Sequence, residues 1–398
     1  MLQLLANIKG KYNQALMTGS LAHFIHDGFS DMLYIFFPIW QAQFSLTFAE
    51  VGFLKTLFSG FLAGFQIPST FLASRLGEAR TLLIGTIVTS ISVFFYGLAP
   101  AFVFLCLLLV AGGLGSSVQH PLSSSIISSE YNDSNKRRVA LSTFNVAGDM
   151  GKLVLPSGVS FIVSQYSWQA ASQIMGIVGL AIAALLFINS RNLIAHNGHL
   201  QSDKQASGFS GWKASNAFWA LLLIGIIDSS TRMGFLTFFP FLMQQKGAEV
   251  ATIGIAFSLV FAGGAMGKFF VGTLATKVGV LRSVIITEIL TTFFIISILN
   301  CSLHIVMIIS LLLGIALNGT SSVLYGSVPD LVKAENQKQA FALFYTATIA
   351  SGAVSPWLYG IFSDVAGINI SVFVVALVAL VTIPLTIPIN KHNQTAQS

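Results

Sequence analysis

Residues 20–40 read SLAHFIHDGFSDMLYIFFPIW and decide the fold class. They are apolar over enough length to cross a bilayer, which takes about 20 helical residues, yet they include His23, Asp27, Asp31 and Tyr34. On a helix these residues share one face, because they follow one another at steps of three or four. Hydrocarbon cannot solvate such a face, so it must look into a protein interior or a wet cavity. The stretch is typical of a transport site.

The composition agrees with a membrane protein. Of 398 residues, 54% are hydrophobic and 9% are charged, whereas a soluble globular chain has about 25% charged residues. Cys106 and Cys301 lie in or at the edge of apolar segments, so they offer neither a disulfide framework nor a metal spacing. Residues 1–14 are short and polar and the first apolar segment is full length, so we expect no cleavable signal peptide.

The apolar segments predict an all-α membrane protein with twelve transmembrane helices. The expected spans are 16–40, 48–72, 80–98, 102–128, 138–163, 168–189, 215–243, 250–273, 281–299, 303–328, 337–362 and 367–389. Residues 190–214 are polar and rich in Gly and Ser, which is typical of a linker. We therefore expect one bundle of six helices over 1–189, a cytoplasmic linker over 190–214 and a second bundle over 215–398.

The basic residues predict the orientation. With the N-terminus in the cytoplasm, fifteen Lys and Arg residues fall in cytoplasmic segments, whereas the outer loops contain only Lys246. This asymmetry predicts a multi-pass protein of the inner membrane with both termini in the cytoplasm. It also accounts for the net charge of +6 without a nucleic-acid partner. Lys55 and Lys268 fall toward the ends of predicted helices, where we expect them to reach the interface.

The two halves repeat one another. An offset of 202 residues places Phe37-Pro38 on Phe239-Pro240, Gly52 on Gly254, Arg75 on Lys277 and Gly77 on Gly279, and an offset of 200 places Pro156 on Pro356. Matches at nearly one offset in several helices predict two parallel, pseudo-symmetric halves. The acidic stripe is not repeated, because Asp27 falls on Ser229 and Asp31 on Met233.

The loops after the second helix of each half carry a family signature. LASRLG at 72–77 and GTLATKVG at 272–279 resemble the G-x-L-a-D-R-x-G motif of the major facilitator superfamily. Ser74 and Thr276 replace the aspartate of that motif, so the charge relay that it implies is not carried over. The resemblance implies the major facilitator fold and alternating access, with gating loops that contain Arg75, Gly77, Lys277 and Gly279.

Three further motifs in the first half resemble the fosmidomycin-resistance branch of that superfamily. They are H-x-x-x-D at 23–27, GLGSSVQHPLSSS at 113–125 and ALSTFNVAGDMGKLVLPS at 140–157. The resemblance implies a proton-coupled secondary transporter that exports small polar or drug-like compounds by antiport. It implies a substrate site lined by the first, fourth, seventh and tenth helices.

We assign proton or ion coupling to His23, Asp27, Asp31 and Asp149. Two carboxylates one helical turn apart in a cavity of low dielectric resist ionising together, and an imidazole can titrate near neutral pH. The alternative is structural: the histidines bond to another helix and an aspartate pairs with a lysine. His26, off the stripe, is expected to be structural, and Glu288 is expected to support a neighbouring helix.

We assign substrate binding to polar residues in the central helices. Asp228 and Arg232 are one turn apart, so they can form a gate, a clamp for an acidic substrate group or a structural ion pair. Lys152 can pair with Asp149 or Asp27, or bind an anionic substrate. The full set is Tyr34, Gln119, His120, Asn145, Lys152, Asp228, Arg232, Asn318 and Tyr325.

Other functions have less support in the sequence. His23, His26 and Asp27 could bind a divalent metal, so a transporter of metal ions or metal chelates is an alternative. A receptor or scaffold with a carrier fold would need a larger docking surface than residues 190–214 offer. No nucleophile elbow or metalloprotease motif points to an enzyme, and no cofactor is expected. The expected partners are a small-molecule substrate, protons and the lipid bilayer, and we expect a monomer.

Overall fold

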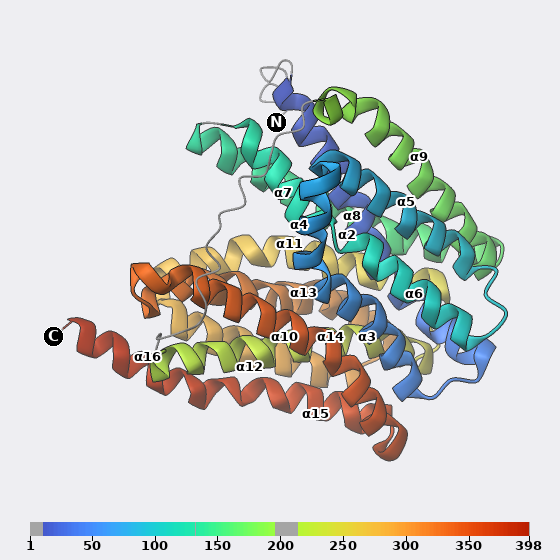
Figure 1. Ribbon diagram of the computed structural model, residues 1–398. Coiled ribbons are helices and arrows are strands. Elements are labelled where there is room, and N and C mark those ends of the chain that lie inside the picture. The colour runs from blue at the N-terminus through green and yellow to red at the C-terminus, as the bar shows by residue number, and fades with distance from the viewer. Residues whose placement is uncertain (1–10, 132, 196–213, 398) are drawn as a thin grey trace. The chain divides into compact units, whose positions relative to one another are not determined.

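The computed structural model describes residues 11–131, 133–195 and 214–397, which form helices and, within these ranges, no strand (Figure 1). In chain order these are α2 (Lys11–Phe44), α3 (Phe48–Gly64), α4 (Gln66–Leu76), α5 (Glu78–Tyr96), α6 (Phe102–Ser116), α7 (Gln119–Glu130), α8 (Ser134–Gln165), α9 (Trp168–Ala195), α10 (Asn216–Gln245), α11 (Val250–Val278), α12 (Val280–Asn300), α13 (Leu303–Gly326), η1 (Val328–Leu331), η2 (Ala334–Asn336), α14 (Gln337–Ala366), α15 (Ile368–Leu380) and α16 (Thr382–Gln397). Most of the predicted linker, residues 196–213, lies outside this description.

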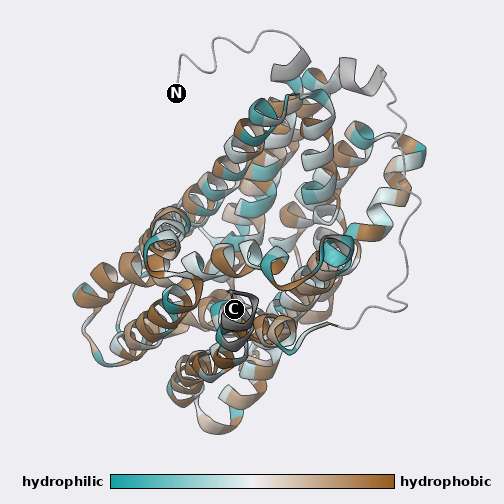
Figure 2. Cartoon of the chain, turned by 90° about the vertical axis from the view of Figure 1, so that its left-hand side faces the viewer, coloured by the Kyte–Doolittle hydropathy of each residue, from teal (hydrophilic) through white to brown (hydrophobic). Residues whose placement is uncertain are grey.

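The helices match the twelve-span plan. Among the described residues, ten helical segments are long and apolar enough to cross a membrane, and the bent pair of α3 and α4 makes an eleventh. Helix α2 is 34 residues long and carries the polar stripe. Large apolar side chains lie on the outer surface, as in Phe161 and Phe269, which are 64% and 72% exposed; Figure 2 shows hydrophobic residues, in brown, along the helices. Such a surface suits lipid and not water.

Two prolines divide predicted spans. Proline lacks an N–H and its ring clashes with the carbonyl four residues earlier. Pro68 lies four residues after Gly64, where α3 ends, and α3 and α4 meet at an angle of 49°. Pro121 lies four residues after Ser117, the residue that caps the C-terminal end of α6. The fourth predicted helix is therefore the pair α6 and α7, and the break places Gln119 and His120 in the first turn of α7.

The chain divides into two compact units. Of the described residues, unit 1 contains 11–36, 57–131 and 133–195, and unit 2 contains 37–56 and 214–397. The end of α2 and the start of α3 thus belong to unit 2, although they come early in the sequence. Within unit 2 the carboxylate of Asp364 accepts hydrogen bonds from the backbone N–H groups of Phe48 (2.7 Å) and Ala49 (2.9 Å).

Candidate functional site

The polar stripe of α2 faces the interior of unit 1. His23, Asp27 and Asp31 are 5%, 9% and 7% exposed. Helix α8 approaches this face closely because it has glycines there. A Cβ on Gly148 would lie 2.4 Å from Nε2 of His23, and one on Gly151 would lie 2.0 Å from the carbonyl oxygen of Phe24. Larger residues at these two positions would separate α8 from α2.

His23 is fixed by contacts on both sides of its ring. Its Nδ1 lies 2.8 Å from the carbonyl oxygen of Phe144, and the imidazole stacks on the Phe144 ring with 4.1 Å between centroids. Its Nε2 lies 3.1 Å from Oδ2 of Asp27. The ring of His120 meets it edge-on at 5.0 Å. The imidazole is therefore held in one orientation between a carbonyl and a carboxyl group.

The contacts of His23 leave a place for a proton between His23 and Asp27. A carbonyl oxygen only accepts, so Nδ1 of His23 carries hydrogen toward Phe144. A neutral imidazole has one N–H group, which this bond uses. A second hydrogen, on the ring or on Asp27, would turn the 3.1 Å contact of Nε2 with Oδ2 into a hydrogen bond.

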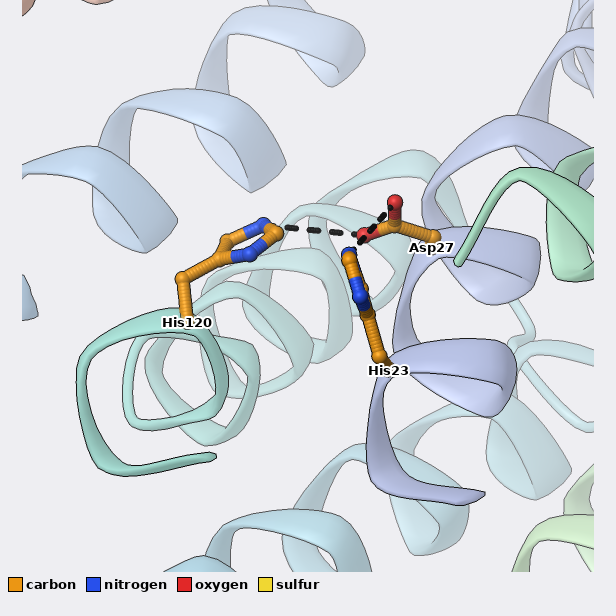
Figure 3. A group of neighbouring side chains, drawn as sticks. All are labelled: His23, Asp27 and His120. Carbon is orange, nitrogen blue, oxygen red and sulfur yellow. Dashed lines mark ion pairs between the residues drawn. The ribbon is translucent and has the colours of Figure 1, made fainter. Parts of the chain in front are cut away.

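Asp27 has two more partners. Nζ of Lys152 lies 3.3 Å from its Oδ2, and Nε2 of His120 lies 3.6 Å from its Oδ1; Figure 3 shows His120 of α7 reaching toward Asp27 beside His23. Nζ of Lys152 also lies 3.9 Å from Oδ2 of Asp31. The side chains of His120 and Lys152 are 36% and 34% exposed, against 12% for Asp27. His120 and Lys152 are therefore the more exposed partners of a buried carboxyl group.

His26 lies apart from the cluster. Its Nε2 is 3.1 Å from the hydroxyl of Thr86 and its Nδ1 is 3.1 Å from the hydroxyl of Ser116. Thr86 donates to the carbonyl of Leu82, so it accepts from Nε2 of His26. The structure thus does not bring His26 together with His23 and Asp27 as possible metal ligands. The groups that lie together are His23, Asp27 and His120, with one ligand atom of each within 4.8 Å of the others.

The other predicted residues of unit 1 have varied surroundings. Tyr34 is fully buried and Gln119 is 1% exposed. No described residue bonds to the amide of Gln119, so this buried amide could bind a solute. Asn145 is exposed and Asp149 is half-buried. Asp149 lies within electrostatic reach of Lys152, which agrees with a role beside the cluster.

In unit 2 Asp228 and Arg232 share α10 but are not bonded. Asp228 is 5% exposed, and the described part of the chain shows no ion pair between the two. Nη1 of Arg232 instead donates to the hydroxyl of Ser321, 3.2 Å away. Asn318 donates to the carbonyl of Gly314 at 3.3 Å. Tyr325 is 45% exposed and packs on aromatic side chains at the start of α14.

The two predicted gating loops have the same backbone conformation. Gly77 and Gly279 have φ angles of 89° and 91°, and each ends one helix and begins the next. This region of φ favours glycine, which explains why both loops have it. Arg75 and Lys277 lie in the last turns of α4 and α11, where a positive charge complements the helix dipole.

One buried charged residue differs from the sequence-based expectation. Lys55 is fully buried, so it does not reach the interface. Glu288 is 2% exposed, and its expected role of supporting or pairing with a neighbour stays a prediction. Thr291 and Thr292, three and four residues after Glu288 on α12, are also polar and buried.

Comparisons with known proteins agree with this architecture. A model of the Major Facilitator Superfamily matches residues 19–227 and 221–398. The fosmidomycin resistance protein of Escherichia coli (strain K12) is 27% identical over 167 residues, which cover 41% of this chain and 41% of that protein. The D-galactonate transporter of Escherichia coli O6:H1 is 23% identical over 259 residues, which cover 59% of this chain and 60% of that transporter. The chain thus matches less than two thirds of the length of either relative.

Solved structures share the fold. A bacterial homologue of the human lysosomal transporter Spinster, described as inward-facing and occupied, superposes with a TM-score of 0.80 at 18% identity, over 97% of this chain and 98% of that one. The nucleoside transporter NupG gives a TM-score of 0.76 at 12% identity, over 94% and 100% of the two chains. The family match, the helical architecture and the buried polar cluster agree, and the chain belongs to the Major Facilitator Superfamily as a membrane transporter, not an enzyme.

Proposed function

We propose that this chain is a proton-coupled secondary transporter that exports a small polar or drug-like solute by alternating access. Protons enter in exchange, and the protein acts as a monomer in the inner membrane with both termini in the cytoplasm. One observation supports the proposal: Nδ1 of His23 donates to the carbonyl of Phe144 while its Nε2 lies 3.1 Å from the carboxyl group of Asp27, a position that suits a bound proton. Export as the direction follows from the resemblance to the fosmidomycin resistance protein.

Asp27 is the proposed proton carrier. Its two oxygens contact His23, His120 and Lys152, so loading or releasing a proton changes the charge that all three experience. Lys152 lies between Asp27 and Asp31, and Asp149 acts on it as well. When Asp27 is protonated, Lys152 turns to Asp31 and Asp149. The three carboxyl groups and His23 therefore work as one coupling unit.

Exchange requires that the solute and the proton exclude one another. A solute group that is cationic or donates hydrogen bonds to Asp27 takes the place of the proton. By linkage, each then weakens the binding of the other. Gln119, whose buried amide bonds to no described residue, and the partly exposed His120 lie beside this position in α7. Tyr34, Asn145, Asn318 and Tyr325 are the further proposed solute contacts.

Arg232 is proposed to hold an acidic group of the solute. The described residues use one of its nitrogens, in the bond to Ser321. A guanidinium has five N–H donors in a planar fork that suits carboxylate or phosphonate groups. The solute that fits these proposed contacts carries a donor or cationic group for Asp27 and an acidic group for Arg232.

The test uses purified protein in proteoliposomes with fosmidomycin and D-galactonate as the first probes. In Asp27→Asn we expect a pH gradient to lose its ability to drive transport, while exchange of labelled for unlabelled solute persists. Asp330→Asn is the matched control, because Asp330 is exposed in η1. If Asp27→Asn leaves transport and its dependence on pH unchanged, the proton role is wrong.

A divalent metal ion or metal chelate is the second candidate solute. The observation that favours it is the closeness of His23, Asp27 and His120, together with the bond from Nδ1 of His23 to a carbonyl, which is usual for a metal-binding imidazole. Against it, Nζ of Lys152 already lies 3.3 Å from Asp27 and would have to move. Calorimetry with Zn²⁺ or Ni²⁺ decides: binding that His120→Ala abolishes supports a metal, and no binding excludes it.

A further inference from the structure

Glu288 is a buried carboxyl group that the proposed function does not use. It lies on the inner face of α12, between Thr287, which accepts a hydrogen bond from Thr320 of α13 (2.8 Å), and Thr292, which donates to Ala376 of α15 (2.8 Å). Its side chain is 2% exposed. No N–H or O–H group of the described residues donates to its Oε1. An ionised carboxylate in this position would be poorly compensated.

Asp228 on α10 is in a similar position. It is 5% exposed, and within the described ranges no hydrogen bond or ion pair reaches it. Glu288 lies within electrostatic reach of both Asp228 and Arg232. Unit 2 therefore contains two buried carboxyl groups near one another and one guanidinium.

The internal repeat gives the geometry of this pair independently. The offset of 202 residues places His26 on Asp228 and Thr86 on Glu288. The structure supports this register, because Gly77 and Gly279 have matching φ angles and directly precede α5 and α12. Thr86 and Glu288 are each the ninth residue of their helix.

The helices around these positions have corresponding neighbours. In unit 1 a Cβ on Gly112 of α6 would meet the hydroxyl of Tyr96 on α5 (2.7 Å) and then the ring of Phe58 on α3 (3.3 Å), whereas in unit 2 a Cβ on Gly314 of α13 would meet the carbonyl oxygen of Val260 on α11 (2.1 Å). Gly112 and Gly314, like Phe58 and Val260, are related by the offset of 202. The corresponding helices are therefore neighbours in both units, with different atoms in contact.

In unit 1 the equivalent side chains are bonded to each other: Nε2 of His26 lies 3.1 Å from the hydroxyl of Thr86. Side chains at these two positions therefore meet across the helix interface. In unit 2 both positions have carboxyl groups, and two carboxyl groups that meet inside a protein share a proton because they resist ionising together. We propose that Asp228 and Glu288 form a second proton-binding site, in which one proton lies between the two carboxyl groups.

Arg232 balances the charge of this pair. With one shared proton the pair has a single negative charge, which the guanidinium one helical turn from Asp228 compensates. Asn318, at the position equivalent to Ser116, donates to Gly314 and not to the pair. The other titratable groups on α12 and on the elements packed against α10 and α12 are Arg282, Lys268, Lys277, His304, Tyr325, Asp330, Tyr345, Tyr359 and Asp364; no bond in the described residues joins any of them to Asp228 or Glu288.

This site goes beyond the proposed function, which needs one proton carrier in unit 1. It places a carrier in each half, Asp27 in the first and the pair Asp228 and Glu288 in the second. It also couples protons to the solute at Arg232. An acidic solute group on the guanidinium reduces the positive charge that acts on the pair, so the pair retains its proton. By reciprocity, a proton on this pair strengthens the binding of that acidic group, whereas a proton on Asp27 weakens the binding of the donor group of the solute.

Infrared spectroscopy of the purified protein tests the site without any solute. The wild type should show the C=O stretch of a neutral carboxyl group at pH 7. Glu288→Gln should abolish that band, and Asp228→Asn should shift it because the partner changes. Asp27→Asn should leave the band of the pair in place, so the test is independent of the proton role of Asp27. Glu249→Gln, a change of an exposed glutamate in the same half, should have no effect.

A carbodiimide provides a second measurement on the wild type. It modifies neutral carboxyl groups in apolar surroundings, so mass spectrometry should find the label on Glu288 or Asp228 at pH 7 and a loss of that label at alkaline pH. This measurement decides the matter even if Glu288→Gln does not fold. An unchanged band in Glu288→Gln, or unlabelled Glu288 and Asp228 in the wild type, would overturn the proposal.

Discussion

The contact between α2 and α8 allows a sharp test of the site geometry. In Gly151→Ala the new Cβ would lie 2.0 Å from the carbonyl oxygen of Phe24. Real Cβ atoms essentially never come within 3.0 Å of another heavy atom, so the two helices must separate by roughly 1 Å or more. Overpacking of this kind costs about 1–3 kcal/mol. Gly151 adjoins Lys152, so the same movement pulls the ammonium away from Asp27.

The effect on the ion pair follows from Coulomb's law. Moving Nζ of Lys152 from 3.3 Å to roughly 1 Å farther from Asp27 weakens their attraction by about 1 kcal/mol at an effective dielectric constant of about 20. Lys152 is one-third exposed, so solvent screening makes this an upper figure. We therefore expect Gly151→Ala to lower both the stability of the protein and the pH response of transport.

Gly158→Ala is the matched control on the same helix. Its Cβ would meet only Cε of Met175, at 3.8 Å, which is an ordinary contact. In both variants the replacement of glycine by alanine stabilises the helix by the same amount, about 0.5–1 kcal/mol. The difference between them is therefore the overpacking cost of about 1–3 kcal/mol. Thermal unfolding of both variants in the same lipid–detergent mixture measures it, and equal stability would refute the close approach of α2 and α8.

Three further predictions concern single side chains. Lys152→Met removes the ammonium beside Asp27, and this loss of positive charge favours the protonated carboxyl group. The pH midpoint of transport should therefore move upward by about one unit or more. An unchanged midpoint would contradict the pairing of Lys152 with Asp27. His26→Ala leaves the hydroxyls of Thr86 and Ser116 without their partner. It should lower the free energy of unfolding of the protein by about 1–3 kcal/mol and leave the pH midpoint of transport unchanged. A shifted midpoint would make His26 part of the coupling unit. Asp364→Ala removes the acceptor for the N–H groups of Phe48 and Ala49. The loss should destabilise the start of α3 by about 0.5–2 kcal/mol, so the two amides should exchange their hydrogen faster. Unchanged hydrogen exchange would show that water or Glu50 replaces the carboxylate.

The sequence was sufficient for the fold and for the direction of the polar stripe. His23, Asp27 and Asp31 follow helical spacing in an apolar segment, and in the structure all three are buried. This inference needed only the geometry of one helix and the cost of placing polar groups in lipid. The breaks at Pro68 and Pro121 could not have been predicted from the local effect of proline alone, because Pro38, Pro156, Pro240 and Pro356 lie inside continuous helices.

The partners of these residues could not be predicted, because they depend on how helices distant in sequence pack. The sequence left three roles open for Lys152, and the distances of 3.3 Å to Asp27 and 3.9 Å to Asp31 now favour the pairing with α2. His26 is bonded to Thr86 and Ser116, which are 60 and 90 residues away. The prediction that Lys55 reaches the membrane interface was wrong. The sequence gives the distance of Lys55 from the end of its helix, but it does not show which face of that helix is buried against other helices.

The repeat relates the backbones of the two halves but not their polar chemistry. Asp27 falls on Ser229, and a Cβ on Gly352 of α14 would lie 2.6 Å from the hydroxyl of Ser229, so a longer, charged side chain has no room there. The preceding position has His26 in the first half and Asp228 in the second. Adjacent residues point about 100° apart on a helix of 3.6 residues per turn, so the two carboxyl groups face different neighbours.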